Sequence, residues 1–146
     1  MENKEDAAGK RPAVEKSSAD RRIRRTKALL LQGLMQLMET KDIRDISVKE
    51  LSDLADINRG TFYLHYRDIY DLLEQIEDEM FMEFNEILNQ DFDYGRNTLS
   101  PQDTLLDIFS FLERHRDAAR IMIGPHGDHS FVNRLKNAVK EYILNP

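Results

Sequence analysis

Apolar residues recur every three or four positions along most of the chain, which is the spacing of amphipathic helices. In the N-terminal part this pattern predicts a helix from about Asp20 to Thr40 and two short helices, one opened by Ser47 and one from Arg59 to about His65. Asp56-Ile57-Asn58 separates the two short helices. No stretch alternates apolar and polar residues between turn signals, so we expect an all-α fold.

The C-terminal part continues the helical spacing. Four further helices are predicted there: from Asp68 to about Leu88, from Pro101 after a Ser100 cap, from Ala118 to Ile123, and a last one carrying Phe131 to Ile143. A loop is expected from Asp91 to Asn97, and Gly124-Pro125 should stop the third of these helices.

Residues 1–18 are polar and include Gly9 and Pro12 but almost no large apolar side chain. Such a segment cannot bury enough apolar surface to offset the entropy lost on ordering, so we expect a disordered arm.

The chain has 146 residues and no Cys, which indicates one domain or two small units and excludes disulfides, Cys-bound zinc and thiol nucleophiles. Its longest apolar run, Ala28 to Leu31, is far too short to span a membrane. The first residues lack the apolar stretch of a signal peptide. We therefore expect a cytoplasmic protein with no membrane partner.

The formal net charge of -6 is divided unevenly between the two halves. Residues 1–67 contain 14 Lys and Arg against 11 Asp and Glu, a net +3, whereas residues 68–146 contain 7 against 16, a net -9. This asymmetry suggests a part that faces an anion, joined to an acidic body. Five cations are concentrated between Arg21 and Lys27, although a solvated helix end would also explain them.

The segment from Ser47 to Tyr66 has the layout of a helix-turn-helix, because two short helices are separated by about three residues. Ser47-Val48-Lys49-Glu50 is a capping box for the first helix, and Asn58 is a suitable N-cap for the second. Such a helix fits the DNA major groove, which is about 12 Å wide. The second helix offers four donor side chains: Arg59, Thr61, Tyr63 and His65.

Within this segment, Gly60-Thr61-Phe62-Tyr63 followed by His65-Tyr66 and an acidic, Leu-rich helix start resembles the DNA-binding segment of the TetR family of transcriptional regulators. The resemblance covers residues 20–75 and is weaker beyond Leu88, where Gly124 to Asp128 looks like a loop signature of one TetR subgroup. It implies a three-helix helix-turn-helix domain over residues 19–67. A helical effector-binding and dimerisation domain would follow over residues 68–146.

Carried over by position, the resemblance implies a set of residues that face DNA: Arg25, Ser47, Lys49, Asn58, Arg59, Gly60, Thr61, Tyr63 and His65. Arg59 and Thr61 would read bases, whereas Tyr63 and His65 would hold phosphate. Tyr66 follows the apolar pattern and is expected in the core. The sequence departs from the family at Asp56, where many members have Gly, and at Ile69, where many carry a Lys that reaches a phosphate.

The resemblance also implies a palindromic double-stranded DNA operator, a small-molecule or protein effector, a homodimer and no cofactor. An effector pocket is predicted to be lined by a set of Met, Phe and Leu side chains, which could also be ordinary core: Met80, Phe84, Phe109, Leu112, Met122 and Phe131. Family members usually continue through two further helices that pair as a dimer. Because this sequence stops at Pro146, we expect either an incomplete chain or other dimer surfaces, and a monomer or weak dimer.

Other functions have weaker support in the sequence. His115, His126, Asp128 and His129 invite a metal site, but an N-cap at Asp128 or Ser130 explains the loop better, so no metal is predicted. No nucleophile–base pair, phosphate-binding Gly loop or dinucleotide fingerprint occurs, and we expect no enzyme. The alternative to a DNA-binding regulator is a helical adaptor whose acidic body binds a protein, with weak or vestigial DNA binding.

Overall fold

The computed structural model describes residues 10–93 and 101–144. These residues form seven α-helices and one 3₁₀ turn: α1 (Lys10–Met38), η1 (Ile43–Asp45), α2 (Val48–Ala55), α3 (Arg59–His65), α4 (Ile69–Asp93), α5 (Pro101–Arg114), α6 (Arg116–Ile123) and α7 (His129–Leu144). The described segments contain no strand, which confirms the all-α prediction. None of their helices combines the length and apolarity needed to cross a bilayer.

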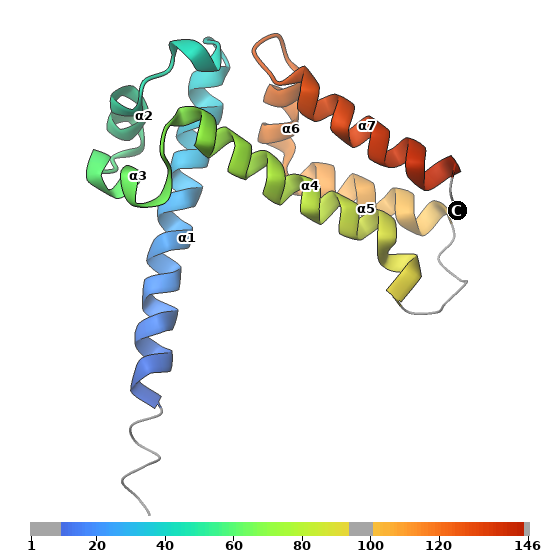
Figure 1. Ribbon diagram of the computed structural model, residues 1–146, viewed down its shortest axis with the longest axis horizontal. Helices are drawn as coiled ribbons and strands as arrows, with labels where there is room; N and C mark the ends of the chain where they lie inside the picture. Colours follow the sequence, from blue (N-terminus) through green and yellow to red (C-terminus); the bar gives the residue numbers. More distant parts are fainter. Residues whose placement is uncertain (1–9, 94–100, 145–146) are drawn as a thin grey trace, which may run out of the picture.

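Two groups of helices share one core (Figure 1). We call α1 to α3 the N-terminal unit and α4 to α7 the body. α2 and α3 pack beside the C-terminal part of α1, and α4 leads from α3 into the body, where α5 and α7 lie along it. The buried side chains form a continuous cluster from Leu30 on α1 to Phe131 on α7. The position of the N-terminal unit therefore depends on how the body packs against it.

The helix α1 begins at Lys10, so the predicted disordered arm over residues 1–18 is wrong for residues 10–18. Residues 1–9 lie outside the described segments. Pro12 is compatible with the first turn, because the first amides of a helix have no intrahelical acceptor. Adding residues to an existing helix costs little compared with nucleating one, so a polar segment can extend α1 without burying a face. Side chains from Ser17 to Arg25 are indeed exposed.

The predicted body helices are confirmed, with different ends. The helix α4 continues to Asp93, so the loop predicted from Asp91 is wrong for residues 91–93, where helix propagation again continues. Residues 94–97 and the predicted cap at Ser100 lie outside the described segments. Pro101 is the first residue of α5, as expected. The amide of Gly124 donates to the carbonyls of Arg120 and Ile121 at the end of α6.

Candidate nucleic-acid interface

The turn between α2 and α3 is set by Asp56, which has φ 55° and ψ 44° and lies in the left-handed region. The amide of Ile57 donates to the carbonyl of Ser52 at 2.9 Å, and the amide of Asp56 donates to Asp53 at 3.4 Å. These two bonds form a Schellman-type helix end, which reverses the chain within three residues. Asp tolerates this conformation better than most residues, which explains how a side chain replaces the expected glycine.

Side-chain caps fix where the two short helices begin. The Ser47 hydroxyl accepts a hydrogen bond from the Glu50 amide at 3.0 Å, and the Asn58 side-chain oxygen accepts one from the Gly60 amide at 2.8 Å. Both predicted N-caps are therefore confirmed. The reciprocal half of the predicted capping box is wrong, because the Glu50 carboxylate contacts the Lys41 ammonium instead of reaching back to Ser47.

A glycine on α1 allows α2 to approach closely. A Cβ atom at Gly33 would lie 2.9 Å from Leu51 Cδ1 and 3.6 Å from the Cβ of Ala55. Leu51 is fully buried at this contact. Because α2 sits directly on α1, the position of α3 is fixed by a rigid support.

The helix α3 has a buried face and an exposed face. Phe62 is fully buried and Tyr66 nearly so, with their ring centroids 5.5 Å apart. Burial, followed by the charges of Glu79 and Asp71, raises the pKa of Tyr66 to about 12, so its phenol stays protonated. The core assignment of Tyr66 is therefore confirmed, and Phe62 fixes α3 beside it.

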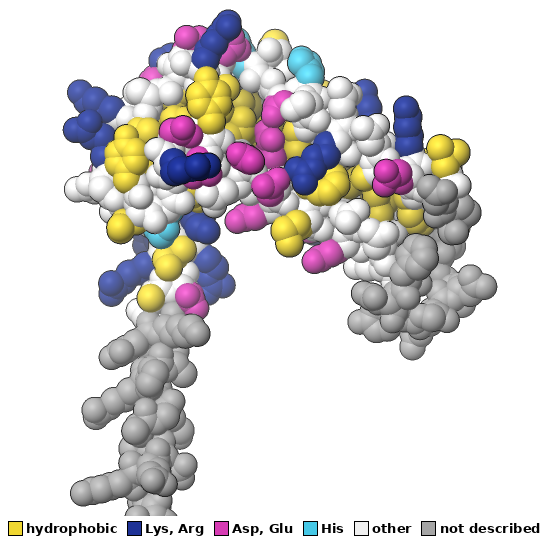
Figure 2. All heavy atoms as spheres, viewed as in Figure 1, with side chains coloured by type: hydrophobic (Ala, Val, Ile, Leu, Met, Phe, Trp, Pro, Cys, Tyr) yellow, Lys and Arg dark blue, Asp and Glu magenta, His cyan; other side chains and the backbone are white. Residues whose placement is uncertain are grey.

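The opposite face of α3 is open to solvent. Arg59 and Gly60 are exposed in its first turn, and Tyr63 is 57% exposed one turn later. Thr61 and His65 are half-buried on the flank of the helix. The remaining predicted contact residues, Arg25, Ser47, Lys49 and Asn58, are exposed around this helix. Figure 2 shows hydrophobic side chains at the surface over α2 and α3, with Lys and Arg on both sides of α1 nearby.

The cations of α1 lie on two different faces. Arg22 precedes Gly33 by eleven residues, which is about three helical turns, so Arg22 shares the side of α1 on which α2 packs; Arg25, one turn after Arg22, lies on the adjoining part of that side. Arg24 and Lys27 instead line a hollow of about 360 Å³ between α1 and α4. Only part of the predicted basic cluster therefore adjoins the helix-turn-helix.

The N-terminus of α4 is occupied by acidic side chains. Asp68 Oδ1 accepts from the Asp71 amide at 2.8 Å, and Asp71 Oδ2 accepts from the Arg67 amide at 2.8 Å. The latter bond is the main reason that the pKa of Asp71 is lowered. Ile69 is buried in the core. This helix end is therefore unsuited to hold a phosphate.

Two exposed residues of this region were not predicted. The Leu64 side chain is 79% exposed on α3, and the Arg67 side chain is 86% exposed just before α4, with a distant ion pair to Asp71 at 3.9 Å. The helical period of α3 could have identified Leu64, because Phe62 and Tyr66 define its inward face. No sequence signal identified Arg67, because a single cation before a helix has no periodic pattern that sets it apart.

The six residues predicted to line an effector pocket do not share one interior space. Four of them are buried in the core: Met80, Phe84, Met122 and Phe131. Phe109 and Leu112 are exposed on α5. The helix α5 turns Thr104 and Phe111 inward and its other side outward, so Phe109 and Leu112 lie apart from the four buried residues.

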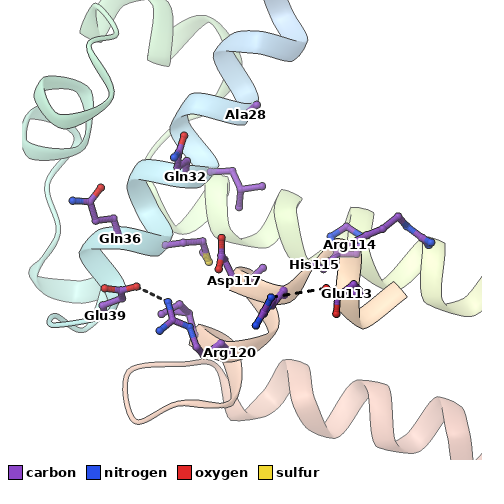
Figure 3. A pocket seen from close by; sticks show the side chains of 14 residues that line it. Ala28, Gln32, Gln36, Glu39, Glu113, Arg114, His115, Asp117 and Arg120 are labelled. Carbon is purple, nitrogen blue, oxygen red and sulfur yellow. Dashed lines mark hydrogen bonds and ion pairs between the residues drawn. The ribbon is translucent and has the colours of Figure 1, made fainter. Parts of the chain in front are cut away.

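A different groove, of about 750 Å³, lies between α1 and the start of α6 (Figure 3). Gln32 and Gln36 line it from α1, and Asp117 lines it from α6. Arg120 donates to a Glu39 carboxylate oxygen at 2.7 Å across one end. The groove is lined by both polar and apolar side chains from helices far apart in the sequence, so no periodic pattern along a single helix predicts it.

The residues considered as metal ligands have other partners. His115 Nε2 lies 2.6 Å from Glu83 Oε2, and His126 Nδ1 lies 2.6 Å from Asp42 Oδ1. Asp128 caps the first turn of α7 by accepting backbone amides, which confirms that alternative. In the segments that the structure describes, no three His, Asp or Glu side chains gather as metal ligands.

Comparisons with known proteins agree with this geometry. Residues 30–76 match the family model described as bacterial regulatory proteins, tetR family. The chain is 27% identical over 107 residues to an uncharacterized HTH-type transcriptional regulator, YxbF, of Bacillus subtilis (strain 168); the match covers 71% of this chain but only 28% of that protein. Among solved structures, the dihydroxyacetone kinase operon activator DhaS is similar with a TM-score of 0.50 and 24% identity, over 82% of this chain and 65% of that one.

Proposed function

Because this chain belongs, through residues 30–76, to the TetR family of bacterial regulatory proteins, we propose that it is a transcriptional regulator that binds double-stranded DNA sequence-specifically. The observation that carries the proposal is the exposed face of α3. It combines a cation, a glycine and a phenol on a helix whose start is capped and whose other face is fixed by Phe62.

Each exposed group has a role that its chemistry supports. The Arg59 guanidinium, one residue past the N-cap, can donate to guanine O6 and N7 in the major groove. Gly60 lets the backbone approach DNA closely, since it adds no side chain there. The Tyr63 phenol, one turn further, can donate to a phosphate without reading a base. Leu64 supplies an apolar surface of the kind that contacts the thymine methyl group.

Phosphate binding depends on cations outside α3. Arg22 and Arg25 extend the positive surface along the side of α1 that carries α2. Arg67 supplies a cation near the position where Ile69 is buried. Ser47 and Lys49 are exposed at the start of α2, where helix amides attract anions.

Regulation is assigned to the body. We infer that a homodimer presents two α3 helices to the half-sites of a palindromic operator, about 34 Å apart or a multiple of this distance. A small molecule or protein effector that binds the body would favour one separation of these helices over another. The groove between α1 and α6 supports this, because a molecule bound there would contact both units.

The salt dependence of DNA binding tests the proposal. Binding to duplex DNA, measured by fluorescence anisotropy over a salt series, should weaken with a slope of roughly -0.9 per phosphate neutralised. Arg22→Gln combined with Arg25→Gln should flatten this slope. The matched control, Arg24→Gln combined with Lys27→Gln, removes the same charge from the same helix and should change the slope less, because these side chains face α4.

One outcome would contradict the proposed DNA binding, and another would contradict the assignment of the two faces of α1. If no duplex pool yields an enriched, palindromic sequence, the helical adaptor is the better description. If both double variants flatten the slope equally, the two faces of α1 do not differ in their distance from DNA.

A further inference from the structure

The loop from Gly124 to Asp128 joins α6 to α7 and is closely packed. Figure 1 shows it near the end of α1, on the side of η1. A Cβ atom at Gly127 would lie 2.0 Å from the Met122 carbonyl oxygen, so only glycine fits without a backbone shift. The amide of Gly127 donates to the carbonyl of Gly124 at 3.1 Å. The conformation of the loop is therefore well defined, and it presents His126 and Asp128 at fixed positions.

The His126 side chain connects the loop to the N-terminal unit. His126 Nδ1 lies 2.6 Å from Asp42 Oδ1, a contact between residues 84 positions apart. Arg44 lies beside the same carboxylate at 3.3 Å. The hydrogen bond from His126 is the main reason that the pKa of Asp42 is lowered. When the imidazole is protonated this contact is an ion pair, and otherwise it is a neutral hydrogen bond.

The Asp128 side chain connects the loop to α4. Asp128 accepts the Ser130 amide at 2.9 Å and the Ser130 hydroxyl at 2.6 Å, and it also contacts the Glu77 side chain. Two carboxyl groups can share a hydrogen bond only if one of them is protonated. Asp128 already serves as an acceptor at the start of α7, so Glu77 carries the proton.

The surroundings of Glu77 favour this protonation. Its Oε1 atom is buried without a hydrogen-bond partner, an arrangement that is costly for a charged carboxylate. Burial, followed by the contact with Asp128, raises the pKa of Glu77 to about 8. The other charged groups around it are Asp78, which raises the pKa further, and Arg134, which opposes the shift while pairing with Asp78 at 2.8 Å.

We propose that the Gly124–Asp128 loop is a proton-dependent joint between the body and the N-terminal unit, held by a proton on Glu77 and by the contact of His126 with Asp42. Loss of the Glu77 proton places two negative carboxylates in contact and loosens the loop from α4. The joint is thus firm at neutral and mildly acidic pH and loose at alkaline pH.

The linkage to stability has a defined sign. Between about pH 4.5 and about 8, the folded chain keeps the Glu77 proton that the unfolded chain loses. The folded state therefore binds more protons in this range, and the free energy of unfolding falls as the pH rises. The stabilising contribution of the Glu77 proton is fully present below about pH 4.5, and it is lost as the pH rises through about 8.

Thermal unfolding of the full chain over a pH series tests the joint. The melting temperature of the wild type should fall by several degrees between about pH 6 and about pH 9, and Glu77→Gln should remove much of that fall, because glutamine keeps a donor for Asp128 and cannot ionise. The matched control is Glu74→Gln, which removes an exposed charge one turn earlier on α4 and should follow the wild-type pH dependence.

The movement itself is measured by the distance between two spin labels. The chain has no Cys, so Asp53→Cys on α2 and Lys140→Cys on α7 place labels at exposed sites in the two units without competing thiols. The distance distribution should broaden from about pH 6 to about pH 9, and Glu77→Gln should keep it narrow. His126→Gln should broaden it already at the lower pH, whereas His129→Gln, at an exposed position, should not.

A pH-independent distance distribution in the wild type would overturn the proposal, as would equal pH dependence in Glu77→Gln and Glu74→Gln. That the joint transmits a signal to DNA rests on the proposed function. The joint itself is measured without DNA, so its failure and the failure of DNA binding are distinguishable.

Discussion

The helices α3 and α5 both expose large hydrophobic side chains, yet their surroundings differ. On α3, Tyr63 and Leu64 are exposed next to Arg59 and a capped helix start. On α5, Leu106 is 63% exposed and Phe109 58% exposed, and both lie in an apolar stripe that also includes Leu105 and Leu112. Exposed apolar area alone therefore does not distinguish a reading surface from an unpartnered helix face. The polar groups that surround the apolar side chains distinguish the two kinds of surface.

The two regions also differ in the range of the contacts that build them. The caps of α2 and α3 join residues two or three positions apart. In the body, Glu83 contacts Arg114 and His115 across 31 and 32 positions, and the body is joined to the N-terminal unit by a link from Glu39 to Arg120 that spans 81 positions. The N-terminal unit is thus specified largely by local sequence, whereas the body depends on packing between distant segments.

The largest expected effect is a difference in the free energy of unfolding between substitutions on the two faces of α3. Phe62→Ala empties a fully buried position and should lower the free energy of unfolding by about 3–5 kcal/mol. Tyr63→Ala, one residue later on the exposed face, should stay within about 0.5 kcal/mol of the wild type. Denaturant unfolding followed by circular dichroism measures both. If the two variants lost a comparable free energy of unfolding, the face of α3 that carries Tyr63 would be packed rather than exposed.

A smaller change in the free energy of unfolding tests whether the backbone conformation at Asp56 is strained. Asp56→Gly removes a side chain from a left-handed conformation and should raise the free energy of unfolding by about 0.5–1 kcal/mol. Asp53→Gly, in the ordinary helical backbone of α2, should lower it by about 1 kcal/mol. The same denaturation assay compares them. If both substitutions changed the free energy of unfolding in the same direction, the turn would not be strained at Asp56.

The sequence predicted most of what local interactions determine. The helix starts at Ser47 and Asn58, the core position of Tyr66 and the chain reversal at Asp56 all follow from short-range patterns, and the structure confirms them. The extension of α1 to Lys10 does not follow from the apolar pattern, because a polar segment that propagates an existing helix has no apolar face.

The body was predicted less well, for a different reason. The spacing of the Phe and Leu residues on α5 did not identify its inward face, because Phe111 is buried whereas Phe109 and Leu112 are exposed. The contact of His126 with Asp42 joins two polar residues that no periodic pattern relates. Such pairs are defined only when the tertiary packing brings their helices together.

The central claim, that the exposed face of α3 reads DNA, is tested most directly by binding-site selection on two variants. Arg59→Ala should cost about 1–3 kcal/mol on the preferred operator and relax the base preference at one position per half-site. Tyr63→Phe removes one donor and should cost roughly 0.5–1.5 kcal/mol while leaving the selected sequence unchanged. Lys136→Ala, an exposed cation of α7, is the control and should select the wild-type sequence at wild-type affinity. If Arg59→Ala selects the wild-type sequence while Tyr63→Phe alters it, the assigned roles are reversed; if neither variant differs from the wild type, α3 does not read DNA.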